Sequence, residues 1–505
     1  MKSSPARIWL ALVVILAIAA AVLFVTMRSP EVQEATSANP VNSPKPEPTA
    51  EPTQRPESPY WSDPADVGKP YPPGTVSGLL TFRGNPTRTY YGEGPVPKSE
   101  PGIAWRYPRS GGLCGSSTDE HGTSTWCGTG WTGQPAVFER DGKTWMIFGA
   151  YDYGVHFLNA DTGDELLPTF KTGDIIKGSV TVDPDGYPLV YTGSRDNYYR
   201  VISFQGKQPK QLWRMSAYDF PQQWNDDWDS SGLVIDDYLF VGGENSQFVI
   251  VKLNRGYGKG GKVKVNPKVV FNAPSFDSQL ISDFGGTATS VENSVAIYKD
   301  TVYFGNSAGL VQGWDISGLK QGKDPKRVFR YWTGDDTDAS VVIDEDGFLY
   351  IGSEYEKGNA RSRAVGQMMK LDPRKKKNPQ VWKINDQGGL PSGVWGTPAL
   401  YKDVVIFDTD GGKVLAADRK TGEVRWTKSL AGPTWQSPVV VDDVLLIGDC
   451  KGTMHAYDMS DTKVDPPELW TKTVGGCIES TPAVWKGRIY FGTRSGTEFA
   501  LGAKR

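Results

Sequence analysis

The sequence has few of the residues that build metal sites and nucleic-acid-binding surfaces. It contains only 3 His and 4 Cys in 505 residues, and no two cysteines form a CxxC pair. A zinc site therefore has few ligands to draw on. The formal net charge is −3, and no basic stretch stands out. These absences argue against a zinc protein and against a partner made of nucleic acid.

Glycine, proline and aromatic residues, by contrast, are plentiful. The chain has 58 Gly, 36 Pro and 11% aromatic residues. Many tight turns and an aromatic-rich core are typical of an all-β fold and would be unusual in a helical bundle.

A repeated unit predicts the architecture. The stretch from Gly396 to Trp426, GTPALYKDVVIFDTDGGKVLAADRKTGEVRW, has the pattern of four short strands separated by turns. Variants of it recur about every 50 residues, as propeller blades do. Their inner strands begin near Gln134, Gly178, Ser231, Ser294, Ser340, Thr397, Ser437 and Thr481. The sequence therefore predicts an eight-bladed β-propeller.

The eighth repeat is incomplete, since the sequence ends soon after its third strand. Residues Gly102 to Tyr107, GIAWRY, have the outer-strand pattern and precede the first inner strand. We expect this N-terminal strand to complete the last blade, because closure removes the exposed sheet edges of an open arc.

The N-terminal part predicts a membrane anchor. Ile8 to Met27 is an uncharged apolar run, long enough at 1.5 Å per residue to cross a hydrocarbon core of roughly 30 Å. A cleaved signal peptide is the alternative. Lys2 and Arg7 precede the run, so we expect a cytoplasmic N-terminus and a single-pass protein of the cell membrane with an extracytoplasmic propeller.

Four regions follow from this pattern. Residues 1–28 are the cytoplasmic stub and transmembrane anchor, and residues 29–59 are a Pro-rich linker whose composition predicts disorder. Residues 60–101 are a loop-rich leading segment, and residues 102–505 are the propeller.

Particular repeats resemble a known family. Ala417 to Trp426, ADRKTGEVRW, resembles the AxDxxTGxxxW signature of pyrroloquinoline quinone (PQQ)-type propeller repeats, and Asn159 to Gly163 and Ala456 to Asp458 are partial copies. Phe82 to Thr89, FRGNPTRT, looks like the FRGxxxxRT leader that precedes many such propellers. The resemblance implies an eight-bladed ring whose outer tryptophans dock between blades.

The family has two branches. Quinoprotein dehydrogenases carry PQQ and a metal in the central channel, whereas scaffolds such as the lipoprotein of the β-barrel assembly machinery are not enzymes. Trp228 and Asp229 match the first half of the dehydrogenase WDxD motif, but Ser231 stands at the second carboxylate, and the adjacent-cysteine disulfide of many such enzymes is missing. A serine cannot act as the base near pH 7.

We therefore expect a protein- or ligand-binding assembly scaffold, and assign no catalytic residue. A PQQ-dependent dehydrogenase that oxidises alcohols or sugars is the alternative. No cofactor is expected, with PQQ and calcium as the alternatives.

The loops before each blade predict the binding face. Aromatic and carboxylate side chains gather there, as in sites that stack on planar ligands or anchor partners. The candidates for contact with a protein or cell-envelope partner are Trp224, Asp226, Asp227, Trp228, Asp229, Asp277, Asp283, Trp395 and Trp435. The alternative is that these tryptophans fill the central channel and the aspartates cap turns.

Two further features concern a metal and the cysteines. Asp227, Asp229 and Ser231 have the spacing of the start of a calcium-binding loop, although Tyr238 stands where an EF-hand places its bidentate Glu. Disulfides are expected between Cys114 and Cys127, and between Cys450 and Cys477, in keeping with an extracytoplasmic location. Four buried thiols are the alternative.

Overall fold

The computed structural model describes residues 58–71, 76–119, 122–130 and 133–503. The predicted membrane span and nearly all of the predicted linker lie outside these residues. Within the described ranges, no helix is long and apolar enough to cross a bilayer. The chain divides into two units, residues 1–50 and 51–505, and all of the described residues belong to the second.

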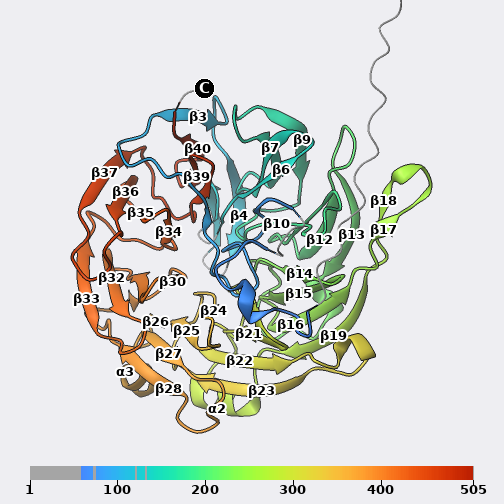
Figure 1. Cartoon of the computed structure of the whole chain (residues 1–505). Helices are drawn as coiled ribbons and strands as arrows, with labels where there is room; N and C mark the ends of the chain where they lie inside the picture. The colour runs from blue at the N-terminus through green and yellow to red at the C-terminus, as the bar shows by residue number, and fades with distance from the viewer. Residues whose placement is uncertain (1–57, 72–75, 120–121, 131–132, 504–505) are drawn as a thin grey trace, which may run out of the picture. The chain divides into compact units, whose positions relative to one another are not determined.

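The predicted eight-bladed all-β propeller is confirmed. Eight sheets, each built on four antiparallel strands, are arranged around a common centre (Figure 1). Their inner strands are β6, β10, β14, β20, β24, β30, β34 and β38, which are the eight that the repeats predict.

Blades 1 to 4 follow the chain in order. Blade 1 contains β6 (Ala136–Arg140), β7 (Lys143–Gly149), β8 (Gly154–Asn159) and β9 (Glu165–Lys171). Blade 2 contains β10 (Thr181–Val182), β11 (Leu189–Thr192), β12 (Tyr198–Ser203) and β13 (Lys210–Ser216). Blade 3 contains β14 (Leu233–Ile235), β15 (Tyr238–Gly243), β16 (Gln247–Lys252) and β19 (Lys268–Pro274). Blade 4 contains β20 (Ala296–Tyr298), β21 (Thr301–Phe304), β22 (Leu310–Asp315) and β23 (Lys326–Trp332).

Blades 5 to 8 complete the ring. Blade 5 contains β24 (Val342–Ile343), β25 (Leu349–Gly352), β27 (Met368–Leu371) and β28 (Gln380–Ile384). Blade 6 contains β30 (Ala399–Tyr401), β31 (Val404–Asp408), β32 (Lys413–Asp418) and β33 (Val424–Ser429). Blade 7 contains β34 (Val439–Val441), β35 (Val444–Gly448), β36 (Thr453–Asp458) and β37 (Glu468–Thr473). Blade 8 contains β38 (Ala483–Trp485), β39 (Arg488–Thr493), β40 (Thr497–Leu501) and β3 (Ile103–Tyr107).

The last blade is closed by the N-terminal strand, as predicted. β3 pairs antiparallel with β40, with Trp105 opposite Ala500. The Trp105 indole is buried and donates a hydrogen bond of 2.8 Å to the carbonyl of Ala160 in blade 1. The same strand therefore completes blade 8 and joins it to blade 1.

Packing explains why a glycine follows the threonine in the Thr-Gly pair of the repeat. Gly422 has a φ of 76°, and a Cβ built there would lie 2.7 Å from the ring of Trp382 in the preceding blade. Gly163, with a φ of 73°, meets Trp105 in the same way. Glycine is needed because it accepts this left-handed backbone and leaves room for the indole. Trp105 and Trp382 thus dock between blades, as the resemblance implies.

The leading segment lies inside the ring (Figure 1). β1 (Gly78–Leu79) pairs with β6 of blade 1, and β2 (Gly92–Glu93) pairs in parallel with β38 of blade 8. Between these strands, residues 80–91 hydrogen-bond to inner-strand residues of blades 2, 4, 5 and 6, or to the residues just before them. The Tyr71 hydroxyl donates to Val234 of blade 3, and Arg83 donates to Pro438 before blade 7. This segment therefore contacts all eight blades.

The remaining elements lie in loops. They include the helices α2 (Ser278–Phe284) and α3 (Ala360–Val365), and the 3-10 turns at Pro64–Asp66, Ala217–Asp219, Lys259–Gly261 and Leu319–Gln321. Three two-stranded sheets are formed by β4 (Cys114–Asp119) with β5 (Gly122–Cys127), β17 (Gly256–Tyr257) with β18 (Val263–Lys264), and β26 (Glu354–Tyr355) with β29 (Ser392–Gly393). Both predicted disulfides, Cys114–Cys127 and Cys450–Cys477, are present.

Candidate functional site

Two groups of buried or partly buried carboxylates lie among the pre-blade loops and the hairpins between second and third strands. Loops of these two kinds open on one side of the ring, which we call the loop face. The first acidic group is Asp229, Glu244 and Glu292, and the second is Asp336, Asp338 and Glu354. In each group, one carboxylate oxygen from each residue lies within 4.8 Å of the others. Among the described residues, these are the two all-carboxylate groups that could hold a metal ion.

The first acidic group already has a lysine partner. Lys177, from the loop before β10, forms an ion pair with Asp229, and its Nζ lies 3.7 Å from Glu244 Oε1. Burial alone would lower the pKa of Lys177, but the charges of Asp229 and Glu244 outweigh it and raise that pKa well above its usual value. The lysine therefore stays charged and takes the place that a cation would have.

Asp227 lies beside this group and has its own cationic partner. The Arg195 Nε lies 2.7 Å from Asp227 Oδ2, and the Arg195 guanidinium lies 5.4 Å from the centre of the Trp126 ring. Burial, followed by the charge of Asp229, raises the pKa of Asp227 to about 8. Arg195 and Lys177 are thus both engaged with carboxylates.

The second acidic group has no such partner. Among ion pairs between described residues, none includes Asp336, Asp338 or Glu354. Lys357, whose charge lowers the pKa of Asp336 in part, has its Nζ 3.9 Å from Asp335 Oδ1 instead. Burial, followed by the charge of Glu292, raises the pKa of Asp336 to about 8. Burial and the charge of Asp336 raise the pKa values of Asp338 and Glu354 well above the usual range. Three carboxyl groups that are costly to ionise therefore lie together here without an ion-pair partner.

Local backbone contacts bring the second group together. Asp336 and Asp338 lie in the loop before β24, and Glu354 begins β26, which continues from β25. The Glu354 amide donates a hydrogen bond of 2.8 Å to the Asp336 carbonyl, and Ser353 Oγ donates to the same oxygen at 3.0 Å. Loop and hairpin are thus joined beside the carboxylates.

The Trp224 to Asp229 loop divides into an exposed and a buried part. Trp224 is 46% exposed. Tyr218, six residues earlier, is 60% exposed and donates a hydrogen bond to Asp226. Trp228 is only 1% exposed, packs edge-on against Tyr199, and donates from Nε1 to the carbonyl of Asn197 at 3.1 Å. Trp224 is therefore open to a partner, whereas Trp228 is a packing group.

The other predicted side chains have local partners. Asp277 accepts a hydrogen bond from the Leu280 amide at the start of α2 and pairs with Arg330, while Asp283 is exposed and accepts from Gln279. Trp395 and Trp435 lie together with ring centres 5.7 Å apart.

The three residues of the predicted calcium loop, Asp227, Asp229 and Ser231, have different partners in the structure. Asp227 and Asp229 face separate cations, and Ser231 Oγ lies 3.2 Å from Thr181 Oγ1. The oxygens that do converge come from Asp229, Glu244 and Glu292. Sequence reasoning missed Glu244, Glu292 and Glu354, because they reach the site from different loops with no shared spacing. Acidic residues directly after a second strand were the one available signal.

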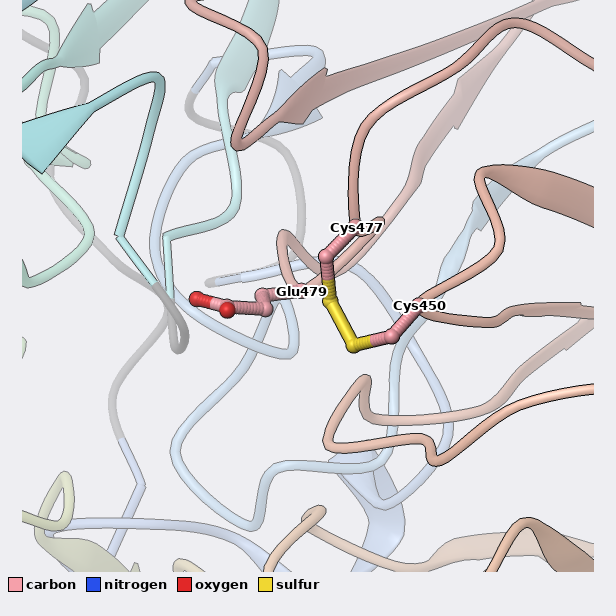
Figure 2. Close-up of side chains that lie close together, drawn as sticks. All are labelled: Cys450, Cys477 and Glu479. Atoms are coloured by element: carbon pink, nitrogen blue, oxygen red, sulfur yellow. A yellow bond between two sulfur atoms is a disulfide. The ribbon is translucent and has the colours of Figure 1, made fainter.

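A third group, Cys450, Cys477 and Glu479, is not a metal site (Figure 2). The two sulfur atoms form a disulfide, so neither is a thiolate ligand. Glu479 instead pairs with Arg494, with 3.2 Å between Oε2 and Nη1. This part of the loop face is therefore held by a covalent bond and an ion pair.

The raised pKa values of the second acidic group predict that the metal-free protein becomes less stable as the pH rises. An acid whose pKa is higher in the folded state binds extra protons there, so its stabilising contribution is lost as pH rises through the folded pKa. For Asp336, with a pKa of about 8, the loss spans about pH 4 to pH 8. We expect the melting temperature in chelating buffer to fall between pH 5 and pH 8, and less steeply in Asp336→Asn. The exposed Asp283→Asn is the control and should follow the wild-type curve; a wild-type melting temperature that rises over this range would contradict the assignment.

Comparisons with known proteins agree with the propeller fold. The PQQ-like repeat model described as outer membrane protein assembly factor BamB matches residues 282–427 and 365–504. The matched residues span blades 4 to 8, and the eight-bladed ring fits the PQQ-like β-propeller family. No curated protein matches the sequence.

Solved structures share the propeller fold at low identity. The quinohemoprotein alcohol dehydrogenase from Comamonas testosteroni is 13% identical, with a TM-score of 0.54 over 85% of this chain and 81% of that one. The computationally designed Ika8 protein is 11% identical, with a TM-score of 0.52 over 73% of this chain and 95% of the design. BamB from Moraxella catarrhalis is 13% identical, with a TM-score of 0.38 over 72% and 83%. The likenesses to the dehydrogenase and to the design concern the fold alone.

Proposed function

We propose that this PQQ-like propeller is a membrane-anchored, extracytoplasmic scaffold that binds a protein or another cell-envelope component on its loop face. The observation that carries the proposal is the exposed pair of Tyr218 and Trp224 beside Asp226. Large aromatic side chains next to polar groups are enriched in the energetically dominant parts of protein interfaces.

The donor set of the loop face supports a scaffold over a quinoprotein dehydrogenase. PQQ is a tricarboxylate, so a PQQ site needs cationic groups that are free to pair with it. Lys177 and Arg195 are engaged with Asp229 and Asp227, and the surrounding groups are carboxylates. These residues do not fit PQQ, and we assign them no step of alcohol oxidation.

The location rests on the sequence and on the disulfides. The apolar run from Ile8 to Met27 has the length of a membrane span, and both disulfides suit an oxidising compartment outside the cytoplasm. We propose an uncleaved anchor that holds the propeller at the outer side of the membrane, where the loop face meets its partner.

Site-specific photocrosslinking tests the binding face. A photoreactive phenylalanine analogue in place of Trp224 should yield a discrete crosslinked product in the protein's own membrane fraction. Val381, 43% exposed on the outer strand β28, is the matched control and should yield none. Trp224→Ala should leave the melting temperature within about 2 °C, because exposed substitutions cost about 0.5 kcal/mol or less.

Two outcomes would contradict the proposal. Equal products at positions 224 and 381 would mean that the loop face is not selective. Saturable, dye-linked alcohol oxidation after addition of PQQ and calcium would favour the dehydrogenase.

A further inference from the structure

The second acidic group differs from the first in that, among the described residues, no lysine or arginine forms an ion pair with it. Asp338 and Glu354 are 8% and 2% exposed, and one carboxylate oxygen of each has no hydrogen-bond partner. One Asp336 oxygen is in the same state. Buried carboxylates without partners are costly, because the interior solvates charge poorly. This arrangement points to a ligand that supplies positive charge.

The first acidic group shows what satisfies such a cluster in this fold. There, Lys177 contributes one positive charge to Asp229 and Glu244. Lys357, in the hairpin region of blade 5, has its Nζ 3.9 Å from Asp335 Oδ1 and 5.1 Å from the centre of the Phe284 ring. The second group is therefore a carboxylate trio whose cation does not come from the described chain.

We propose that Asp336, Asp338 and Glu354 bind a hard divalent cation, and that the cation is Ca²⁺. Oxygens on opposite sides of one Ca²⁺, each about 2.4 Å from the ion, are about 4.8 Å apart. The three carboxylates lie within that span. The group contains no His or Cys, which excludes the donors that zinc and copper prefer.

The site also has the other parts that a calcium site needs. Asp336 is only partly buried, so ions and water can reach the trio from the loop face. Glu292, whose negative charge raises the pKa values of all three residues, adds to the attraction for a cation from outside this trio. Ca²⁺ accepts six to eight oxygens in flexible geometry, so water can complete the shell. Mg²⁺ demands near-ideal octahedral geometry and gives up its water reluctantly.

The inference goes beyond the proposed scaffold function and does not depend on it. It also differs from the calcium loop predicted from Asp227, Asp229 and Ser231, because the ligands come from blade 5. Photocrosslinking at Trp224 reports on the partner, and ion binding reports on this site, so each can fail separately.

The test uses the full chain in detergent, stripped of metal and titrated with CaCl₂. Calorimetry should show saturable binding of one Ca²⁺ per chain. The melting temperature should rise by about 4 °C when the free Ca²⁺ concentration is one hundred times the dissociation constant. Glu354→Gln should weaken binding at least tenfold and remove the rise. Glu498→Gln is the matched control: Glu498 is equally buried and its oxygens have no partner, but it stands outside both acidic groups. It should bind Ca²⁺ like the wild type.

A second readout separates a cation site from a purely structural cluster. In excess chelator, Glu354→Gln should melt at a higher temperature than the wild type, because a neutral amide replaces a buried carboxyl group that is costly to ionise. A structural role predicts the opposite shift. Asp338→Asn provides the same comparison if Glu354→Gln does not fold. Absence of a Ca²⁺-dependent shift in the wild type, Ca²⁺ binding retained in both variants, or stronger stabilisation by Mg²⁺ than by Ca²⁺ would overturn the proposal.

Discussion

Replacement of Arg83 with methionine is expected to lower the free energy of unfolding by about 4 kcal/mol. Arg83 is fully buried at the centre of the ring. Its guanidinium donates to the carbonyls of Pro398 and Pro438, which precede the inner strands of blades 6 and 7, at 2.8 and 2.5 Å. Methionine keeps much of the volume but leaves both buried carbonyls without this donor. Thermal unfolding should show a fall of at least about 5 °C.

The control is an arginine that makes no such contacts. Arg109 is 75% exposed in its side chain and pairs with Asp164 at the surface. Arg109→Met should change stability by no more than about 0.5 kcal/mol, as expected for an exposed ion pair. If Arg83→Met and Arg109→Met melt together, the leading segment does not hold the blades.

Deletion of β3 (Ile103–Tyr107) is expected to be more damaging still. The deletion removes the outer strand of blade 8, exposes the edge of β40, and removes Trp105 from its contact with blade 1. Truncating a buried tryptophan alone costs about 3–5 kcal/mol. We expect Trp105→Ala to lower the melting temperature by several degrees, and the deletion to produce aggregated or unfolded protein.

Removal of the Pro-rich residues 29–50 is the matched control for this deletion. It shortens the chain by more residues but should leave the melting temperature unchanged, since its composition cannot form a packed core. Equal melting temperatures for the two deletions would refute ring closure by β3. Calorimetry and light scattering together distinguish unfolding from aggregation.

Arg83→Met and the β3 deletion both test what keeps the ring closed, one at its centre and one at its rim. Arg83 acts at the centre, where one segment contacts every blade, and β3 acts at the rim, where one strand joins the first and last blades. A closed ring keeps the pre-blade loops in fixed positions. That rigidity is what allows Trp224 and the two acidic groups to be presented as one face.

The blades can be predicted from local sequence alone. The signals are local: apolar residues that alternate with a period of two, turn residues such as Lys402–Asp403 and Asp410–Gly412, and an outer aromatic residue. Similar signals recur in the other repeats. The closing strand followed from the missing outer strand of the last repeat. The disulfides followed from cysteines placed at facing loop positions, and Cys114 and Cys127 are direct cross-strand partners in β4 and β5.

The make-up of the site, by contrast, depends on the closed ring. Trp224 and Trp228 lie four residues apart in the same acidic loop. Trp224 is nevertheless exposed, whereas Trp228 is buried and packs edge-on against Tyr199. The depth of a loop residue depends on the neighbouring blade, which the local sequence does not encode. For the same reason, the sequence did not show that Lys177 neutralises Asp229 while Lys357 turns to Asp335, or that the leading segment fills the ring. Burial and charge pairing between residues far apart in the chain arise only when the ring closes and brings their loops together.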